Sequence, residues 1–125
     1  DWYGLDSIYC SADCADVFSP KVVQATMGSI GRIEVIETEL PDLLSESDIP
    51  SYAAVLAGEI NIHELKNFEG GILVIGNEAS GISSELQSKA AHTVSIPRLG
   101  QAESLNAAMA TGILLDNMTR LINKA

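Results

Sequence analysis

The stretch that decides the fold is Gly71-Ile72-Leu73-Val74-Ile75-Gly76, followed directly by Asn77-Glu78-Ala79-Ser80-Gly81. The first half is apolar and bounded by glycines, which is typical of a strand buried on both faces of a parallel sheet. The second half is polar and rich in turn-forming residues. We therefore predict a strand that runs into a loop at the edge of a sheet where ligands bind in open parallel folds.

Strands and helices are expected to alternate along the whole chain, which predicts a single α/β domain over residues 1–125 with a mostly parallel sheet and flanking helices. Ser19 before Pro20, and Ser104 near the C-terminus, are expected to be helix N-caps. The apolar face of the last helix is expected to consist of Leu105, Ala108, Met109, Gly112, Ile113 and Leu121. Strands are predicted at 7–11, 33–37, 52–56, 71–76 and 93–96, and helices at 21–27, 40–46, 61–67, 83–90 and 104–124.

The charge balance argues against nucleic acid when it is taken alone. The 125 residues carry 17 acids and 7 bases, a net charge of −10. Nucleic-acid binders normally present a basic surface, because neutralised phosphates supply much of their affinity. However, residues 1–50 hold ten acids and two bases, whereas residues 51–125 hold seven acids and five bases. The acidity therefore belongs mainly to the N-terminal part, and we expect this chain alone to bind RNA poorly.

The two cysteines do not indicate a metal site. Cys10 and Cys14 are three residues apart, but His63 and His92 lie far from them in the sequence. A zinc site needs further ligands at close spacing. We expect two reduced thiols near the end of a strand, and no metal.

We expect neither a targeting segment nor a membrane span in this chain. No apolar run approaches the ~20 residues that span a bilayer. The first residues, Asp1-Trp2-Tyr3-Gly4, are neither basic nor apolar enough for a secretory leader. We expect a cytoplasmic protein with no membrane association. Because there is no initial Met, we also expect a fragment that is truncated at its N-terminus.

Two interpretations of the loop after the central strand stay open. A phosphate-binding loop is excluded, because Ile82-Ser83 follows Gly81 where that motif needs Lys and then Ser or Thr. Gly76 could let the backbone approach a ligand that Asn77 and Glu78 then hydrogen-bond. Alternatively, the segment is an ordinary strand-to-helix turn. Asn106 carries the same ambiguity, since it either ties down the preceding loop or faces a ligand.

Three segments resemble one enzyme family. Residues 73–82 resemble the second motif of SpoU-type RNA ribose methyltransferases of the SPOUT superfamily, and residues 96–106 with the following 107–115 resemble the third. Residues 19–29 are similar to the segment between the first two motifs. The resemblance implies transfer of a methyl group from S-adenosylmethionine to a ribose 2′-hydroxyl of tRNA or rRNA. It also implies a C-terminal trefoil knot and a homodimer in which the last helix takes part.

The resemblance assigns roles to particular positions. Asn106 is implied to arrange the catalytic site, and Glu78 matches an acid that orders the same region. The implied contacts to the cofactor are Leu56, Gly76, Asn77, Glu78, Ile96, Leu99, Ser104 and Leu105.

The chain departs from the family pattern at three places. Gln24 stands where the family usually has Arg, and Arg98 replaces a common Met. The first motif, with its catalytic arginine, is missing, so the chain is expected to begin just after it. Gln24, the missing arginine and the net charge of −10 leave one alternative open, a methyltransferase-like module that binds RNA or a protein without catalysis. A generic phosphate- or nucleotide-binding α/β domain is the third hypothesis.

Overall fold

The structure is a computed structural model that describes residues 1–122, and these form two compact units that divide after residue 43. Strands and helices alternate in both units. All strand pairs within the described residues are parallel, apart from one isolated bridge in a loop. This arrangement confirms the predicted α/β class with flanking helices.

The N-terminal unit contains a two-stranded parallel sheet. Strand β1 (Ser7–Cys10) pairs with β2 (Glu34–Glu37). Between them lie helix α1 (Pro20–Thr26) and one 3₁₀ turn, η1 (Ser29–Gly31). Because parallel strands cannot be joined by a tight hairpin, the helical connection is what the pairing requires.

Helix α1 begins and ends within one residue of its predicted bounds. The Ser19 hydroxyl accepts a hydrogen bond from the Val22 amide at 3.4 Å, and Pro20 occupies the first turn, where its missing N–H costs nothing. Met27 adopts a left-handed conformation with φ of 51°, and Gly28 follows with φ of 93°. A helix cannot continue through left-handed residues, so α1 stops at Thr26.

The C-terminal unit contains a four-stranded parallel sheet in the order β4-β6-β3-β5. Tyr52 of β3 aligns with Leu73 of β5 on one side and with His92 of β6 on the other. The elements in chain order are α2 (Leu40–Glu46, across the division between the units), β3 (Ser51–Ala54), β4 (Ile60–Asn61), η2 (Ile62–Glu64), β5 (Ile72–Val74), α3 (Ser84–Lys89), β6 (His92–Ser95) and α4 (Ala107–Ile122).

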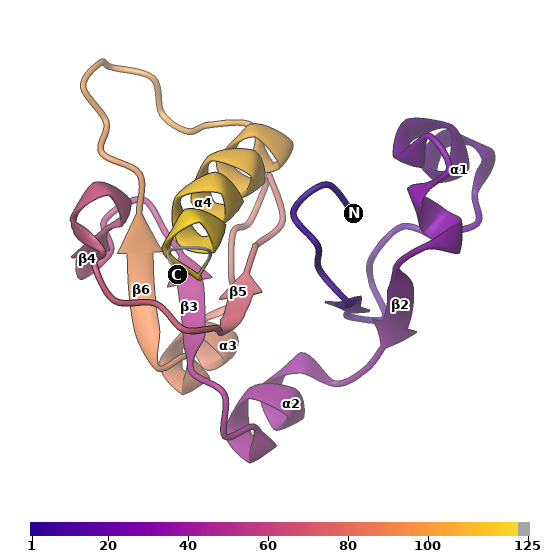
Figure 1. Ribbon diagram of the computed structural model, residues 1–125, viewed down its shortest axis with the longest axis horizontal. Helices are drawn as coiled ribbons and strands as arrows, with labels where there is room; N and C mark the ends of the chain where they lie inside the picture. The colour runs from indigo at the N-terminus through magenta and orange to yellow at the C-terminus, as the bar shows by residue number, and fades with distance from the viewer. Residues whose placement is uncertain (123–125) are drawn as a thin grey trace. The chain divides into compact units, whose positions relative to one another are not determined.

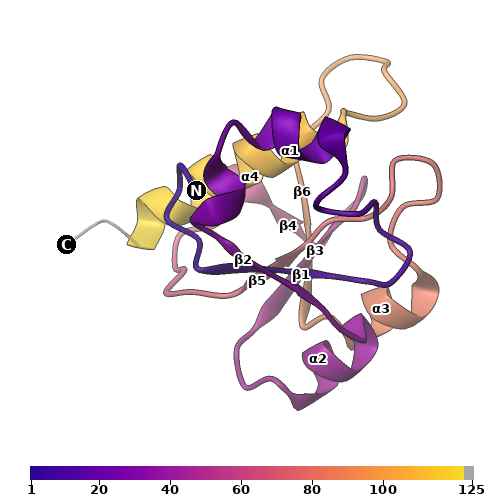
Figure 2. The same cartoon turned by 90° about the vertical axis from the view of Figure 1, so that its right-hand side faces the viewer.

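Helix α4 covers one face of this sheet, and α3 lies on the opposite side, as Figures 1 and 2 show. The buried core lies beneath α4 and joins three kinds of element. Leu114 and Met118 are one helical turn apart and face the sheet residues Tyr52 and Val94 and the 3₁₀ residue Ile62. This packing fixes both η2 and α4 against the sheet.

Three local expectations were wrong. The helix predicted at 61–67 is only the single turn η2, because Ile60 and Asn61 instead form the short strand β4 beside β6. Strand β5 is not buried on both faces, since Val74 is the only one of its three residues that is buried. Helix α4 starts at Ala107 rather than just after Ser104, and its predicted end near Lys124 lies outside the described residues.

The expected apolar face of α4 was misplaced in part, since Ile113 and Leu121 are half-buried but other expected positions are not. Leu105 precedes the helix, and Met109 is 62% exposed. The buried positions are instead Leu114 and Met118. The helix is apolar on more than one side, so spacing alone could not tell which side faces the sheet.

Candidate cofactor-binding loops

The carboxyl ends of three neighbouring strands bring the candidate residues to one edge of the sheet. Strand β3 lies between β5 and β6, and all three run parallel. The turn with Leu56 follows β3, the loop from Gly76 to Gly81 follows β5, and residues 96–106 follow β6. In Figure 1 the last of these is the long orange loop that leads into α4. This edge is where open parallel sheets bind ligands.

The loop after β5 is held by its own backbone. The Asn77 amide donates to the Gly81 carbonyl oxygen at 3.2 Å, and the Gly81 amide donates back to the Asn77 carbonyl at 2.7 Å. The Asn77 side-chain oxygen accepts the Ala79 amide at 2.7 Å. Gly81 has φ of +68°, in the left-handed region that favours glycine. The loop is therefore closed without help from charged side chains.

Gly76 sits where only a glycine fits. A Cβ added there would lie 2.4 Å from the carbonyl carbon of Gly81 and 2.5 Å from the amide nitrogen of Ile82. Both atoms belong to the backbone, so neither can swing away. The glycine that the sequence suggested for close approach to a ligand is thus required by the loop itself.

Glu78 is exposed at the tip of this loop. Its carboxylate has no hydrogen-bond or ion-pair partner among residues 1–122. The amide of Ala79, one residue along, donates to the Asn77 side-chain oxygen instead. The Asn77 side chain, and not Glu78, makes the turn contacts, so the ordinary-turn and ligand-binding interpretations of this loop both stay open. The carboxylate remains available to accept a hydrogen bond from a ligand amine or hydroxyl.

The loop after β6 offers backbone groups and apolar side chains. Ile96 packs at the border of the core, whereas Leu99 is 100% exposed. Arg98 donates from Nη1 to the Ala102 carbonyl at 3.1 Å and so bends the loop back on itself. Within the described part of the chain, no backbone–backbone hydrogen bond holds residues 97–105. Apart from the Ala102 carbonyl, which accepts from Arg98, their amides and carbonyls are open to a ligand.

Asn106, and not Ser104, caps helix α4. Its side-chain oxygen accepts the amides of Ala108 at 2.9 Å and Met109 at 3.2 Å. Ser104 is exposed and makes no such contact. The sequence did not distinguish the two positions, because Ser and Asn are nearly equal N-cap residues. The capping oxygen is engaged, so the Asn106 amide NH₂ is left as the free polar group.

The candidate residues share an edge, but their side chains do not form one network. No hydrogen bond joins Glu78 to Asn106 among the described residues, and both are exposed. Leu56 is 73% exposed and Leu105 is also exposed. The arrangement is that of two backbone loops with apolar side chains around them.

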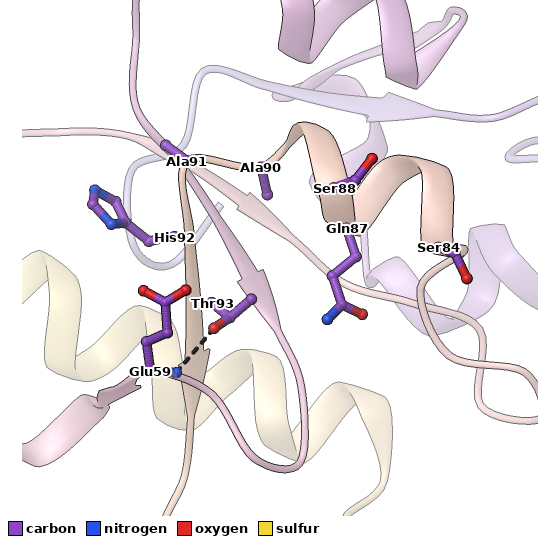
Figure 3. A pocket seen from close by; sticks show the side chains of 8 residues that line it. All are labelled: Glu59, Ser84, Gln87, Ser88, Ala90, Ala91, His92 and Thr93. Carbon is purple, nitrogen blue, oxygen red and sulfur yellow. Dashed lines mark hydrogen bonds between the residues drawn. The ribbon is translucent and has the colours of Figure 1, made fainter.

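A separate depression lies away from these loops. An open cavity of about 430 Å³ is lined by Glu59, His92 and Thr93 together with residues of α3, at the amino end of β6. Figure 3 shows the Glu59 amide donating to the Thr93 hydroxyl oxygen, a bond of 2.9 Å. None of the predicted site residues lines this cavity. It is therefore separate from the loops at the carboxyl edge.

Gly58, which lets the turn after β3 approach the backbone of β6, was not anticipated from the sequence. A Cβ on Gly58, in the turn after β3, would lie 2.7 Å from the carbonyl carbon of Val94. The turn thus passes directly over β6. The only signal in the sequence was a lone glycine after an apolar run, which marks close backbone approach without naming the partner.

The two thiols are free, and the structure gathers no metal ligands around them within residues 1–122. Cys10 is half-buried at the end of β1 and Cys14 is exposed. Burial, and then the neighbouring Cys14, raise the pKa of the Cys10 thiol. The described part of the chain contains no group of three or more side chains suited to holding a metal ion, nor a helix long and apolar enough to cross a membrane.

A family model described as the SpoU rRNA Methylase family matches residues 1–116, so the chain belongs to that family. It is 33% identical over 118 residues to the 23S rRNA (guanosine(2553)-2'-O)-methyltransferase RlmP of Bacillus subtilis. The matched residues are 92% of this chain and 48% of the relative. It is 29% identical to the 23S rRNA (uridine(2479)-2'-O)-methyltransferase of Streptomyces viridochromogenes, over 98% of this chain and 46% of that protein. The chain spans about half the length of the curated relatives it matches.

Solved structures agree with this assignment. A putative RNA methyltransferase of the TrmH family from Porphyromonas gingivalis superposes with a TM-score of 0.85 at 39% identity, over 96% of this chain and 51% of that one. An AdoMet-bound rRNA methyltransferase from Sinorhizobium meliloti gives a TM-score of 0.87 at 32% identity, over 95% of this chain and 47% of that one. These likenesses confirm the family that the motifs indicated.

Proposed function

We propose that this chain is the cofactor-binding part of an S-adenosylmethionine-dependent RNA methyltransferase that acts on a ribose 2′-hydroxyl of rRNA or tRNA. The observation that carries the proposal is the meeting of the three connections after β3, β5 and β6 at one sheet edge. The names of the relatives, which are 2'-O-methyltransferases of 23S rRNA, support it.

The residues at this edge suit S-adenosylmethionine. Leu56, Leu99 and Leu105 are exposed apolar side chains on the turn after β3 and on the loop after β6. They would cover the adenosine, whose ring edges can hydrogen-bond to the open backbone groups of residues 97–105. The remaining assigned contacts are Gly76, Asn77, Glu78, Ile96 and Ser104. Glu78 would accept a hydrogen bond from an amine or hydroxyl of the cofactor.

Methyl transfer requires the protein to align the two reacting groups and to help remove a proton. The cofactor supplies an activated sulfonium methyl group, while a ribose hydroxyl is a weak nucleophile. Alignment of the two groups provides much of the rate, and removal of the hydroxyl proton assists it. The Asn106 amide NH₂ is free because its oxygen caps α4, so it would donate to an oxygen of the substrate and orient it. The loop after β5 is held in position by its own backbone, so Glu78 would act on the cofactor and not on the loop.

The wider assignments rest on the family resemblance. We propose RNA as the partner, a cytoplasmic setting, a homodimer formed partly through α4, a C-terminal knot and a single methyltransferase domain. Gln24 supports the second candidate, a module that binds RNA or a protein without catalysis, since the family usually has Arg there.

The test uses the full-length protein. Radiolabelled S-adenosylmethionine is incubated with tRNA and rRNA pools, and calorimetry measures binding of S-adenosylhomocysteine. We expect label in one RNA class, lost in Asn106→Ala, with the methyl group mapped to a ribose by mass spectrometry. Binding of S-adenosylhomocysteine with no label in any RNA would favour the non-catalytic module. Absence of both binding and label would refute the proposal.

A further inference from the structure

A groove runs between η2 and the C-terminal half of α4, and none of the assigned cofactor contacts lines it. It has a volume of about 570 Å³, and its polar side is formed by His63, Lys66, Asn117 and Arg120. We call it the η2–α4 groove. Its wall includes Ile62, which is 2% exposed and belongs to the core beneath α4. The groove is therefore built on fixed elements.

Positive charge gathers in this groove although the chain is acidic. Lys66 and Arg120 are two of the seven Lys and Arg residues in a chain with a net charge of −10. None of the described residues that line the groove is acidic. The nearest acids by sequence, Glu64 and Asp116, form no ion pair with either cation within residues 1–122.

A neutral group orients Arg120. Its guanidinium donates from Nη2 to the Asn117 side-chain oxygen at 2.9 Å, and Asn117 in turn donates to the Ile113 carbonyl at 2.8 Å. The side chain is thereby directed while its charge stays unneutralised. Arg32 differs, because it pairs with Asp1 at 2.8 Å, and so does Lys89, which pairs with Glu85 at 3.8 Å.

Helix chemistry alone accounts for only part of this arrangement. A cation in the last turn of a helix complements the partial negative charge of its C-terminus, which explains Arg120. It does not explain why Lys66 and His63, which belong to a different segment, meet the same groove. Two cations from separate elements, one with planar donors, suit a phosphate group.

We propose that the η2–α4 groove binds a backbone phosphate of the RNA substrate through Lys66 and Arg120, an inference that rests on the proposed function. Asn106 caps α4 and Arg120 lies in its last turn, so the rise of the helix places them about 20 Å apart. The phosphate is thus remote from the reacting ribose. The groove contributes to RNA affinity and not to the chemical step.

The experiment uses the full-length protein and the variant Lys66→Gln with Arg120→Gln. Binding of a mixed-sequence single-stranded RNA oligonucleotide is followed by fluorescence anisotropy over a series of chloride concentrations. We expect affinity to fall about tenfold, and the slope of log K against log salt to shrink by about 0.7 for each RNA phosphate that the variant no longer neutralises. KM for RNA should rise while kcat and S-adenosylhomocysteine binding stay unchanged.

Lys89→Gln is the matched control, because it removes one charge from an exposed lysine already paired with Glu85. It should change RNA affinity less than twofold, whereas Arg120→Gln alone should change it severalfold. Equal effects of the control and of Arg120→Gln would overturn the groove assignment. Inorganic phosphate is added at a concentration equal to that of the RNA phosphate groups. If it displaces the RNA, RNA is not the ligand of the groove.

The two levels of the proposal fail differently. Suppose that S-adenosylhomocysteine binds and the RNA is methylated, but the groove substitutions leave RNA affinity unchanged. The groove is then not an RNA site, and the proposed function stands. If RNA affinity depends on the groove but neither cofactor binding nor methylation is found, the groove stands and methyl transfer falls.

Discussion

Gly76 and Gly81 approach each other so closely that a Cβ on Gly76 would lie 2.4 Å from the Gly81 carbonyl carbon. Two backbone hydrogen bonds between Asn77 and Gly81 hold this contact, so the loop cannot open locally to admit a side chain. The shape of the first cofactor loop is therefore set by its backbone, and Glu78 is presented from its tip.

Gly76→Ala should consequently reshape the loop. Because both obstructing groups are backbone, we expect S-adenosylhomocysteine affinity to fall by at least tenfold, as measured by calorimetry. Gly112→Ala is the control, since a Cβ there meets no atom within 4 Å. It should raise the free energy of unfolding by about 0.5–1 kcal/mol, because alanine is the better helix former. Unchanged cofactor affinity in Gly76→Ala would show that this loop does not bind the cofactor.

Asn106 combines two roles that substitutions can separate. Asp is as good an N-cap as Asn, so Asn106→Asp should keep the stability of α4, whereas Asn106→Ala should lower the free energy of unfolding by about 1 kcal/mol. Both variants lose the amide NH₂, so both should lose methyl transfer. The measurements are urea unfolding and methylation of RNA by the full-length protein. Full turnover in Asn106→Asp would show that Asn106 acts only as the N-cap of α4.

The alternation of strands and helices was predictable because local signals agreed with the packing. Ser19-Pro20 began α1 as expected, and the first three residues of the apolar run at 72–75 formed β5. Local signals failed where a distant partner decided the outcome. Ile60 and Asn61 became a strand because β6 lies beside them, a pairing that no short-range pattern contains.

The candidate loops were predictable for a related reason, and the groove was not. Residues 76–81 and 96–106 each follow a strand directly, and parallel strands bring their carboxyl ends to one edge. Lys66 and Arg120 share no strand end or helical spacing. Only the packing of η2 on α4, through Ile62 and Leu114, brings them to one groove.

The two thiols should differ in reactivity. Thiolate is the reactive form, and burial raises the pKa of Cys10, so less of it is ionised at a given pH. Cys14 is exposed. Alkylation by iodoacetamide near pH 8, followed by peptide mass spectrometry, should label Cys14 several times faster than Cys10. The difference between the two rates should narrow as pH rises through the pKa of Cys10. Equal rates at pH 8 would contradict the described burial of Cys10.

The core beneath α4 should depend on the buried side of the helix. Leu114 is 1% exposed, and Leu114→Ala should lower the free energy of unfolding by about 2–5 kcal/mol through lost burial and a residual cavity. Ile113→Ala, a half-buried neighbour on the same helix, should cost less. Urea unfolding with a common slope for all variants gives the comparison. A larger cost at Ile113 would mean that the helix faces the sheet differently.

Met109 tests the proposed homodimer on a different side of α4. It is 62% exposed on a helix whose core contacts are made by Leu114 and Met118. If α4 forms the interface, Met109→Glu places a charge between two copies, and sedimentation equilibrium should show at least tenfold weaker association of the full-length protein. The free energy of unfolding of the monomer should barely change, because surface substitutions usually stay within about 0.5 kcal/mol. Met109→Leu keeps the apolar contact and should associate as the wild type does. A dimer of undiminished affinity in Met109→Glu would place the interface away from this side of the helix.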